Sequence, residues 1–352
     1  MTRAQAPRIY AETSKSEPFD ISVVIPAHDA MPWVLDAVDS ALSQTMPPGE
    51  VVIVDDGSSD GTAEAILQRY GGRPGVRVVR GRFGGAAAAR NAGWRAATRP
   101  WVGFLDADDV WFPEKLATAA ATLQAFPFAG WFFSDGTYRP LEGTEWRSWL
   151  AAYADVREPY VGHPIAQLFE VNFVLTSSVV GRRSLLKELK GFDARMSHAE
   201  DLDLWIRLAR RAPAAAAARP LVRYHVRPTG LTRQIERRLM GDVELFERLA
   251  RDPELSPTLR RRARRREALA HFKLAFDALR AGRRRATWSR LPKAWMFPER
   301  AFPVGALALV SLLPDAWLRA LARRGLGAHP ASRRAFALAR VALHADPILL
   351  AA

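Results

Sequence analysis

Three aspartates directly follow an apolar run and could bind a cation. The run Trp101–Leu105 leads into Asp106, Asp108 and Asp109, and Pro113 then opens a new helical pattern. This order predicts a buried strand, a polar loop at its carboxyl end and a helix, and ligands of open α/β sheets bind at that end. Asp106 and Asp108 are alternate residues of an extended segment, so they can point the same way. The stretch predicts either a site for Mg²⁺ or Mn²⁺, which prefer hard oxygen ligands, or a solvated acidic loop.

Two further groups that could do chemistry lie later in the chain. Asp201 stands at the start of a predicted helix over 197–208, on the face that also carries Trp205. A carboxylate there either favours the positive helix end or, if partly buried, accepts a proton at a raised pKa. His225 lies in the strand pattern 221–227, where it is either a satisfied polar group or a ligand for a cation or phosphate.

Length and composition limit the class of protein. With 352 residues, 49% of them hydrophobic and 25% charged, the chain is globular and long enough for two domains. It has no cysteine, which excludes a disulfide framework, a zinc–thiolate site and a thiol nucleophile. Residues 1–20 lack the apolar core of a signal peptide, so we expect a cytoplasmic protein.

The net excess of positive charge lies entirely in the C-terminal third of the chain. Residues 1–232 hold 26 Lys and Arg against 26 Asp and Glu, whereas residues 233–352 hold 25 against 11, a difference that equals the whole net charge of +14. Such a segment either meets a polyanion or consists of solvated helix faces. It has no nucleic-acid-binding motif, so we predict no nucleic-acid partner and favour an anionic membrane surface.

Alternating strands and helices position the acidic groups. Strand patterns at 21–26, 51–54, 76–80 and 101–105 are separated by helix patterns at 32–42, from 62 onward and at 86–97. This alternation predicts a mostly parallel sheet with helices on both faces. Acidic residues end three of the four strands, at 26–29, 55–60 and 106–109. Chain-distant acids are thereby gathered along one edge of the sheet.

A loop and an insert complete this part of the chain. The glycine-rich loop 81–85 precedes the helix that carries Arg90, an arrangement that suits a diphosphate but also fits a simple connector. After a predicted strand at 131–134, the irregular region 135–162 is rich in Trp, Tyr and Pro. We expect this insert to face an acceptor.

Six stretches together resemble family 2 glycosyltransferases with the GT-A fold. They are Val23–Asp29, Val54–Thr62, Ala89–Gly93, Leu105–Asp109, Gly191–Asp193 and Glu200–Trp205. The resemblance implies a Rossmann-like α/β fold with a mixed, mostly parallel sheet flanked by helices, followed by an α-helical C-terminal region. We expect a lead-in over 1–20, a catalytic domain over 21–232 and a basic helical region over 233–352.

The resemblance also implies roles for single residues. It implies that the nucleotide sugar contacts Pro26, Ala27, Asp56, Arg90, Asp106, Ala107 and Asp108. Asp56 would hold the nucleobase, Arg90 would help with the diphosphate and Asp106 would contact the ribose. Asp108 and Asp106 would hold Mg²⁺ or Mn²⁺, and His225 is a further candidate ligand although the family's usual Tyr-Arg-x-His order is changed here. Asp201 would be the general base, and we expect the acceptor side to include Glu200, Trp205 and Trp111.

These observations lead to one functional prediction. We predict an inverting glycosyltransferase that moves a sugar from a nucleotide-diphosphate donor, UDP-linked by preference, to a hydroxyl of a glycan or lipid-linked acceptor in surface polysaccharide synthesis. The alternatives are a catalytically silent nucleotide-sugar-binding module at a membrane and a sugar nucleotidyltransferase. The apolar segment 302–314 is shorter than the ~20 residues that span a bilayer and is either interfacial or a packed core helix. We expect the protein to lie peripherally on the inner face of the plasma membrane.

Overall fold

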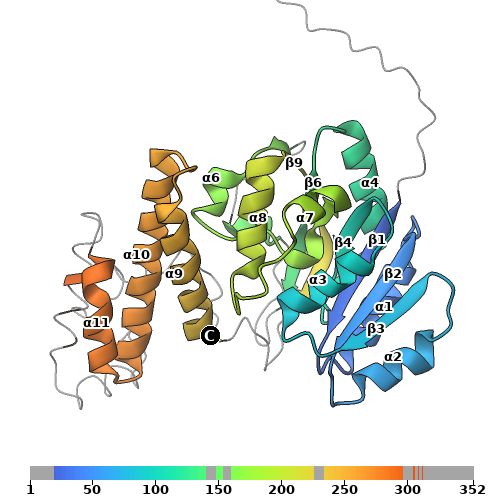
Figure 1. Ribbon diagram of the computed structural model, residues 1–352, viewed down its shortest axis with the longest axis horizontal. Coiled ribbons are helices and arrows are strands. Elements are labelled where there is room, and N and C mark those ends of the chain that lie inside the picture. Colours follow the sequence, from blue (N-terminus) through green and yellow to red (C-terminus); the bar gives the residue numbers. More distant parts are fainter. Residues whose placement is uncertain are drawn as a thin grey trace, which may run out of the picture.

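The computed structural model describes residues 20–139, 148–153, 160–225 and 234–295, with positions 304, 305, 308 and 311. Over these residues the strands form one mixed sheet, with helices on its faces and further C-terminal helices beside it (Figure 1). The strands are β1 (Ile21–Ala27), β2 (Glu50–Asp56), β3 (Val76–Gly81), β4 (Trp101–Phe104), β5 (Val110–Trp111), β6 (Trp131–Arg139), β7 (Tyr160–Gly162), β8 (Val180–Arg182) and β9 (Ala214–His225). The helices are α1 (Trp33–Leu42), α2 (Thr62–Tyr70), α3 (Ala86–Ala96), α4 (Lys115–Ala125), α5 (Leu150–Tyr153), α6 (Ile165–Leu168), α7 (Arg183–Glu188), α8 (Glu200–Arg211), α9 (Ile235–Arg251), α10 (Pro257–Arg280) and α11 (Arg284–Ala294), with a 3₁₀ turn, η1 (Thr176–Ser178).

The first four strands form the parallel part of the sheet, in the order β3-β2-β1-β4. β1 and β2 are rich in Val and Ile that are fully buried, as expected of strands covered on both faces. Their register sets Ala27 beside Asp55, and Asp56 beside Gly81. The carboxyl ends of these strands therefore lie at one edge, as the alternation of strands and helices predicts.

The second part of the sheet is mixed. β8 pairs antiparallel with β4 and β6, and β9 pairs antiparallel with β5 and β7 but parallel with β6. β6 continues to Arg139, past register shifts around Asp135, although the sequence pattern indicates an irregular region from 135 onward. Such a register shift breaks the strict alternation by which a strand is found from sequence. Residues 140–147 and 154–159 of the expected insert lie outside the described residues.

Two tryptophans expected on the acceptor side are core residues, and the structure corrects that prediction. Trp205 is 0% exposed and stacks on Trp131, with ring centroids 6.1 Å apart. Trp111 is 2% exposed, and its Nε1 donates to the carbonyl of Ser177 at 2.6 Å. Both rings belong to buried hydrophobic clusters, because a large aromatic side chain gains free energy when its apolar surface is removed from water. Neither lines the cleft described below.

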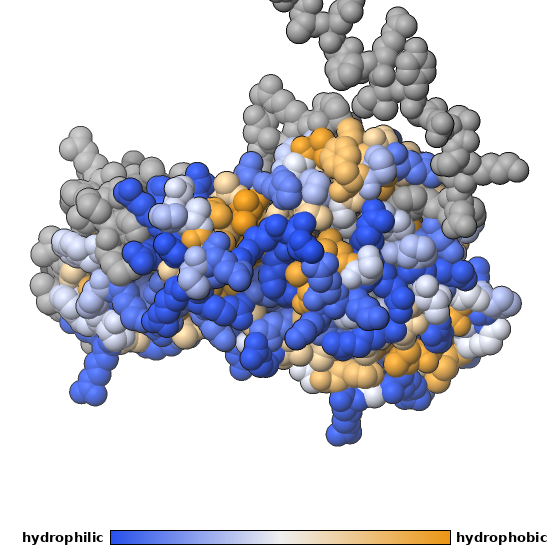
Figure 2. Space-filling view, turned by 45° about the horizontal axis from the view of Figure 1, so that its top comes forward, coloured by the Kyte–Doolittle hydropathy of each residue, from blue (hydrophilic) through white to orange (hydrophobic). Residues whose placement is uncertain are grey.

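The basic C-terminal helices share their core with the α/β part. Leu245, Phe246 and Leu249 of α9 belong to the same buried cluster as Leu204 and Trp205 of α8. α10 packs along α9, and α11 packs on α10 through Leu291 and Ala294 (Figure 1). The outer surface of these helices is largely hydrophilic in Figure 2.

Some predicted features fall outside the described residues. These are the lead-in 1–19, the last two residues of the strand pattern 221–227, and most of the apolar segment 302–314. Among the helices that the structure describes, none has the length and apolar character required to cross a bilayer.

Candidate functional site

A cleft of about 980 Å³ opens at the carboxyl edge of the parallel strands. Asp56, Asp106, Asp108 and Asp201, which are far apart in the chain, all line it. So do Pro26, Ala27, Arg90, Ala107, Glu200 and His225. The cleft thus brings together every predicted site residue except Trp111 and Trp205. The individual roles of the cleft residues are proposed below.

Asp56 organises the glycine-rich loop after β3. Its carboxylate accepts hydrogen bonds from the backbone N–H groups of Phe83, Gly84 and Gly85, the last at 2.7 Å. Gly84 and Gly85 have φ of +87° and +125°, values that a residue with a Cβ rarely adopts. The acid therefore fixes the loop at the start of α3, next to the cleft wall formed by Pro26 and Ala27.

The acidic loop after β4 is braced by a buried serine and a buried aspartate. Ser177 Oγ accepts from the backbone N–H of Asp106 at 3.0 Å and donates to the carboxylate of Asp109. The same carboxylate accepts from the N–H of His225 at 3.0 Å. Burial, followed by the charges of Asp108 and Asp106, holds the pKa of Asp109 well above its ordinary value. Three crowded carboxylates of this kind favour a nearby cation.

The donor atoms in this loop fit a hard divalent cation. His225 Nδ1 lies 2.8 Å from the carbonyl oxygen of Asp108. This hydrogen bond selects the tautomer that carries its proton on Nδ1, so Nε2 keeps a lone pair. In the described part of the chain, no three His, Cys, Asp or Glu side chains form a metal site by themselves. Asp106, Asp108 and His225 line the same cleft. Carboxylate oxygens together with the phosphate oxygens of a nucleotide are the ligands that Mg²⁺ and Mn²⁺ prefer.

Arg90 is the central ion-pairing group of the cleft floor. Its guanidinium donates to Asp106 Oδ1 at 2.7 Å and to Glu200 Oε1 at 2.9 Å, and the residue is 6% exposed. The charges of Asp106 and Glu200 outweigh burial and raise its pKa, so it stays protonated. Arg90 therefore ties the acidic loop to the start of α8, which the sequence pattern does not indicate. Glu200, expected on the acceptor side, is occupied by this ion pair.

Asp201 lies in the first turn of α8. It accepts from Asn172 Nδ2 at 3.0 Å and from the N–H of Leu202 at 2.6 Å. Burial and the neighbouring charge of Glu200 raise its pKa from 3.8 to about 6, against the opposing effect of Arg90. A carboxylate with this pKa is ionised at neutral pH yet basic enough to accept a proton from a hydroxyl.

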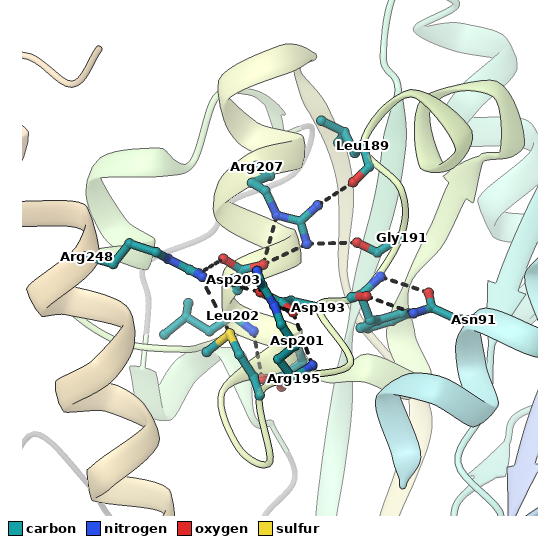
Figure 3. A network of polar contacts seen from close by, with 12 residues as sticks. Asn91, Leu189, Gly191, Asp193, Arg195, Asp201, Leu202, Asp203, Arg207 and Arg248 are labelled. Carbon is teal, nitrogen blue, oxygen red and sulfur yellow. Dashed lines mark hydrogen bonds and ion pairs between the residues drawn. The ribbon is translucent and has the colours of Figure 1, made fainter. Parts of the chain in front are cut away.

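A network of ion pairs holds α8 in place (Figure 3). Asp203 binds Arg207 one turn later at 2.6 Å and also Arg248 of α9. Arg207 donates to the carbonyls of Leu189 and Gly191, at 2.8 Å each, which ties α8 to the end of α7. Asp203 is 4% exposed, so the acid at the centre of this network is buried, whereas the side chains of Arg207 and Arg248 are partly exposed, at 26% and 45%.

Several cleft residues were not identified from the sequence. Asn172, His198, Arg238, Asp242 and Arg266 line the cleft, the last three from α9 and α10. No local pattern distinguishes Asn172. The three C-terminal residues sit in a charge-rich stretch in which the sequence does not show which arginines are solvated.

A family model described as Glycosyl transferase family 2 matches residues 22–189. The chain carries a family 2 glycosyltransferase domain. Curated relatives agree over parts of this domain. Chondroitin synthase of Pasteurella multocida (strain Pm70) is 42% identical over 96 residues, which cover 27% of this chain and 10% of that protein. The putative teichuronic acid biosynthesis glycosyltransferase TuaG of Bacillus subtilis is 36% identical over 124 residues, or 33% of this chain and 49% of that protein.

These matches span less than half of the length of either relative. Solved structures resemble the glycosyltransferase domain and its C-terminal helices more completely. S. aureus TarS 1-349 superposes with a TM-score of 0.61 at 17% identity, covering 87% of this chain and 92% of that chain. The mannosyltransferase PcManGT of Pyrobaculum calidifontis gives 0.58 at 22% identity, covering 94% and 86%. At these identities the likeness shows the GT-A fold.

Proposed function

We propose that the chain is an inverting glycosyltransferase that uses a nucleotide-activated sugar. The observation that carries this proposal is the placement of Asp201 in the same cleft as Asp56, Asp106 and Asp108. Donor-side groups and a carboxylate with a pKa of about 6 thereby face one space. A silent binding module would need no such base, and this favours an enzyme.

The reaction assigns a role to each part of the cleft. Asp56 and the cleft wall at Pro26 and Ala27 would bind the nucleoside, and Asp106 and Asp108, with His225, would hold the cation; all of them line the cleft. A Mg²⁺ or Mn²⁺ ion held by these residues would supply positive charge that offsets the charge of the departing diphosphate. Asp201 takes the proton of the acceptor hydroxyl while its oxygen bonds to the anomeric carbon, and the bond from that carbon to the diphosphate breaks. One displacement inverts the anomeric configuration.

Arg90 acts as a positioning residue in this scheme. Its donors already bind Asp106 and Glu200, so it orients the acidic loop and α8 rather than contacting the diphosphate directly. Its charge also restrains the rise in the pKa of Asp201. A diphosphate could reach the guanidinium only by replacing one of these carboxylates.

The donor class is supported by neighbours of the fold. TarS has been solved with UDP-GlcNAc, and PcManGT with GDP-Man and Mn²⁺. We propose a UDP-sugar donor and a hydroxyl acceptor on a surface glycan or glycolipid. TuaG, which bears the name of teichuronic acid biosynthesis, supports surface polysaccharide as the acceptor class.

The test is a panel of UDP- and GDP-sugars incubated with the full chain and Mn²⁺, with release of the nucleoside diphosphate as the readout. Asp201→Asn should lower the rate about 10² to 10⁴-fold while leaving the dissociation constant of the nucleotide unchanged. Asp203→Asn is not a matched control because it breaks the network of Figure 3. Asp36→Asn, an acid on α1 that does not line the cleft, serves instead. Equal rates for Asp201→Asn and the wild type would refute the assigned base.

We also propose that α11 docks on an anionic membrane. Arg285, Trp288, Pro292 and Trp295 recur at spacings of three and four and are exposed, the two tryptophans by 45% and 51%. The opposite face of α11 is buried against α10. Tryptophan is favoured at the membrane interface, and arginine is attracted to anionic lipid. This stripe would hold the enzyme peripherally on a cytoplasmic leaflet, close to a lipid-linked acceptor.

Vesicle sedimentation tests the docking. The wild type should bind phosphatidylglycerol vesicles more strongly than phosphatidylcholine vesicles, and binding should fall as salt screens the charges. The double variant Trp288→Ser, Trp295→Ser should bind several-fold more weakly. Phe128→Ser, which removes a 63% exposed aromatic elsewhere, is the control. Equal binding of the double variant and the control would contradict the proposal.

A further inference from the structure

The turn η1 extends the pairing of two strands as far as the acidic loop. β4 pairs antiparallel with β8, and just before β8 the carbonyl of Val179 accepts from the N–H of Phe104 at 3.1 Å. Continued along the chain, the same register places Ser177 opposite Asp106. There the hydroxyl of Ser177, in place of its carbonyl, accepts from the N–H of Asp106 at 3.0 Å. A side chain therefore completes the ladder at the point where the acidic loop begins.

Two buried side chains hold the carbonyl groups of this turn. Trp111 Nε1 donates to the carbonyl of Ser177 at 2.6 Å, and Lys115 Nζ donates to the carbonyl of Ser178 at 2.6 Å. Trp111 ends β5 and Lys115 begins α4, and they are 2% and 0% exposed. We call these two contacts the η1 clamp. Because the clamp occupies the carbonyl of Ser177, the hydroxyl is the group left to meet Asp106.

Lys115 is an unusual residue for its position. It is the first residue of α4, where a positive charge opposes the helix dipole. Its Nζ lies 4.4 Å from the ring centroid of Phe132 and 5.8 Å from that of Trp111. Within the described residues no carboxylate offsets its charge, and burial lowers its pKa well below the ordinary value. An apolar side chain would be buried here at a lower cost in free energy. The hydrogen bond to Ser178, and not packing, therefore accounts for an amine at this place.

A displacement of η1 would reach the acidic loop at two points. Ser177 Oγ contacts both the N–H of Asp106 and the carboxylate of Asp109. Asp109 in turn accepts from the N–H of His225 at 3.0 Å and donates its own N–H to the carbonyl of Asp106 at 3.0 Å. Asp108 lies within the loop that these contacts close. The position of η1 therefore affects the spacing of all three residues proposed to hold the cation.

We propose that Trp111 and Lys115 are positioning residues for the divalent cation, although neither lines the cleft. They act through η1: the clamp fixes Ser177, and Ser177 fixes the acidic loop in the geometry that binds Mg²⁺ or Mn²⁺. Contacts behind the ligands of a metal site commonly change its affinity by about 10- to 100-fold when they are lost. This inference rests on the proposed function, since it concerns the cation that the same cleft would hold.

The experiment measures the Mn²⁺ concentration at which the full chain reaches half of its maximal binding of UDP, or of GDP if UDP does not bind, by calorimetry. Trp111→Phe keeps an aromatic ring but removes the Nε1–H donor. Lys115→Met keeps the length of the side chain but removes the amine. Each variant should need about tenfold more Mn²⁺ than the wild type. The thermal unfolding midpoint, taken without nucleotide or metal, reports any general loss of stability.

Trp131→Phe is the matched control, because the indole of Trp131 is also buried but its Nε1 donates to the carbonyl of Ala212, outside η1, at 3.3 Å. It should need as much Mn²⁺ as the wild type, even if its unfolding midpoint falls. An unchanged Mn²⁺ requirement in a folded clamp variant, or an equal rise in Trp131→Phe, would overturn the inference while leaving the proposed function intact. Trp111→Phe, the milder change, decides if Lys115→Met does not fold. Failure of the wild type to bind either nucleotide, or binding that does not depend on Mn²⁺, would instead contradict the proposed function, and this inference with it.

Discussion

At the scale of single residues, Asp201 combines burial with charge. Its pKa of about 6 arises from burial and from Glu200, and Arg90 and Asn172 keep it from rising further. The ionised form is the base, so the rate of transfer should rise as pH increases through about 6 and then level off. A pH profile of kcat measures this acid limb. A profile that stays flat from pH 5 to 8 would contradict a catalytic Asp201, because the carboxylate could not then be the titrating base.

The raised pKa of Asp201 also predicts that Asp201→Asn, which loses activity, gains stability. A carboxyl whose folded pKa lies above its unfolded value of 3.8 destabilises the fold as pH rises through the interval between them. Asp201→Asn should therefore raise the free energy of unfolding at pH 8 by about 1 to 3 kcal/mol, and by little at pH 4. Urea denaturation at the two pH values checks this. An equal gain at both would indicate an effect unrelated to ionisation.

The sequence identified the acids but not what holds them. Asp56, Asp106, Asp108 and Asp201 stand out because each ends a strand or begins a helix, and that is a local pattern. Ser177 and Asn172 touch them across 71 and 29 positions of chain, and no local pattern reports such contacts. Trp205 was misassigned because a residue on the stripe of Asp201 is expected near the cleft, whereas its ring packs on Trp131.

At the scale of elements, the close approach of α3 to the sheet places Arg90. Gly93 lies one turn after Arg90, and a Cβ at this position would lie 2.2 Å from Val24 Cγ1 of β1. Gly93→Ala should lower the free energy of unfolding by about 1 to 3 kcal/mol through overpacking. Gly162→Ala is the control, since its Cβ would meet nothing nearer than 3.7 Å. Equal unfolding midpoints for the two variants would show that α3 can shift without cost.

Element type was predictable where one periodicity dominated. The parallel strands and α1, α3 and α8 follow clear patterns in the sequence and appear within a few residues of the expected bounds. β5, β7 and β8 are two or three residues long, too short to show alternation, and pair with strands that are distant in the chain. Their antiparallel pairing is set by tertiary contacts and could not be derived locally.

At the scale of the whole molecule, the C-terminal helices are part of the cleft and of the core. Phe246 of α9 is 0% exposed and packs edge-on against Phe169, with ring centroids 5.8 Å apart. Phe246→Ala should cost about 3 to 5 kcal/mol. A single cooperative transition should remain if α9 and the α/β part unfold together, which thermal unfolding followed by calorimetry would show. Two separated transitions would mean that the helices form an independent unit.

The central claim is that four chain-distant acids act on one nucleotide in one cleft. The most direct measurement is calorimetric binding of UDP with Mn²⁺ to the wild type and to Asp56→Asn, Asp108→Asn and Asp201→Asn. We expect Asp56→Asn and Asp108→Asn to weaken nucleotide binding at least tenfold, and Asp201→Asn to bind as the wild type does while failing to transfer sugar. Undiminished nucleotide binding by Asp56→Asn and Asp108→Asn, together with undiminished transfer by Asp201→Asn, would contradict the claim.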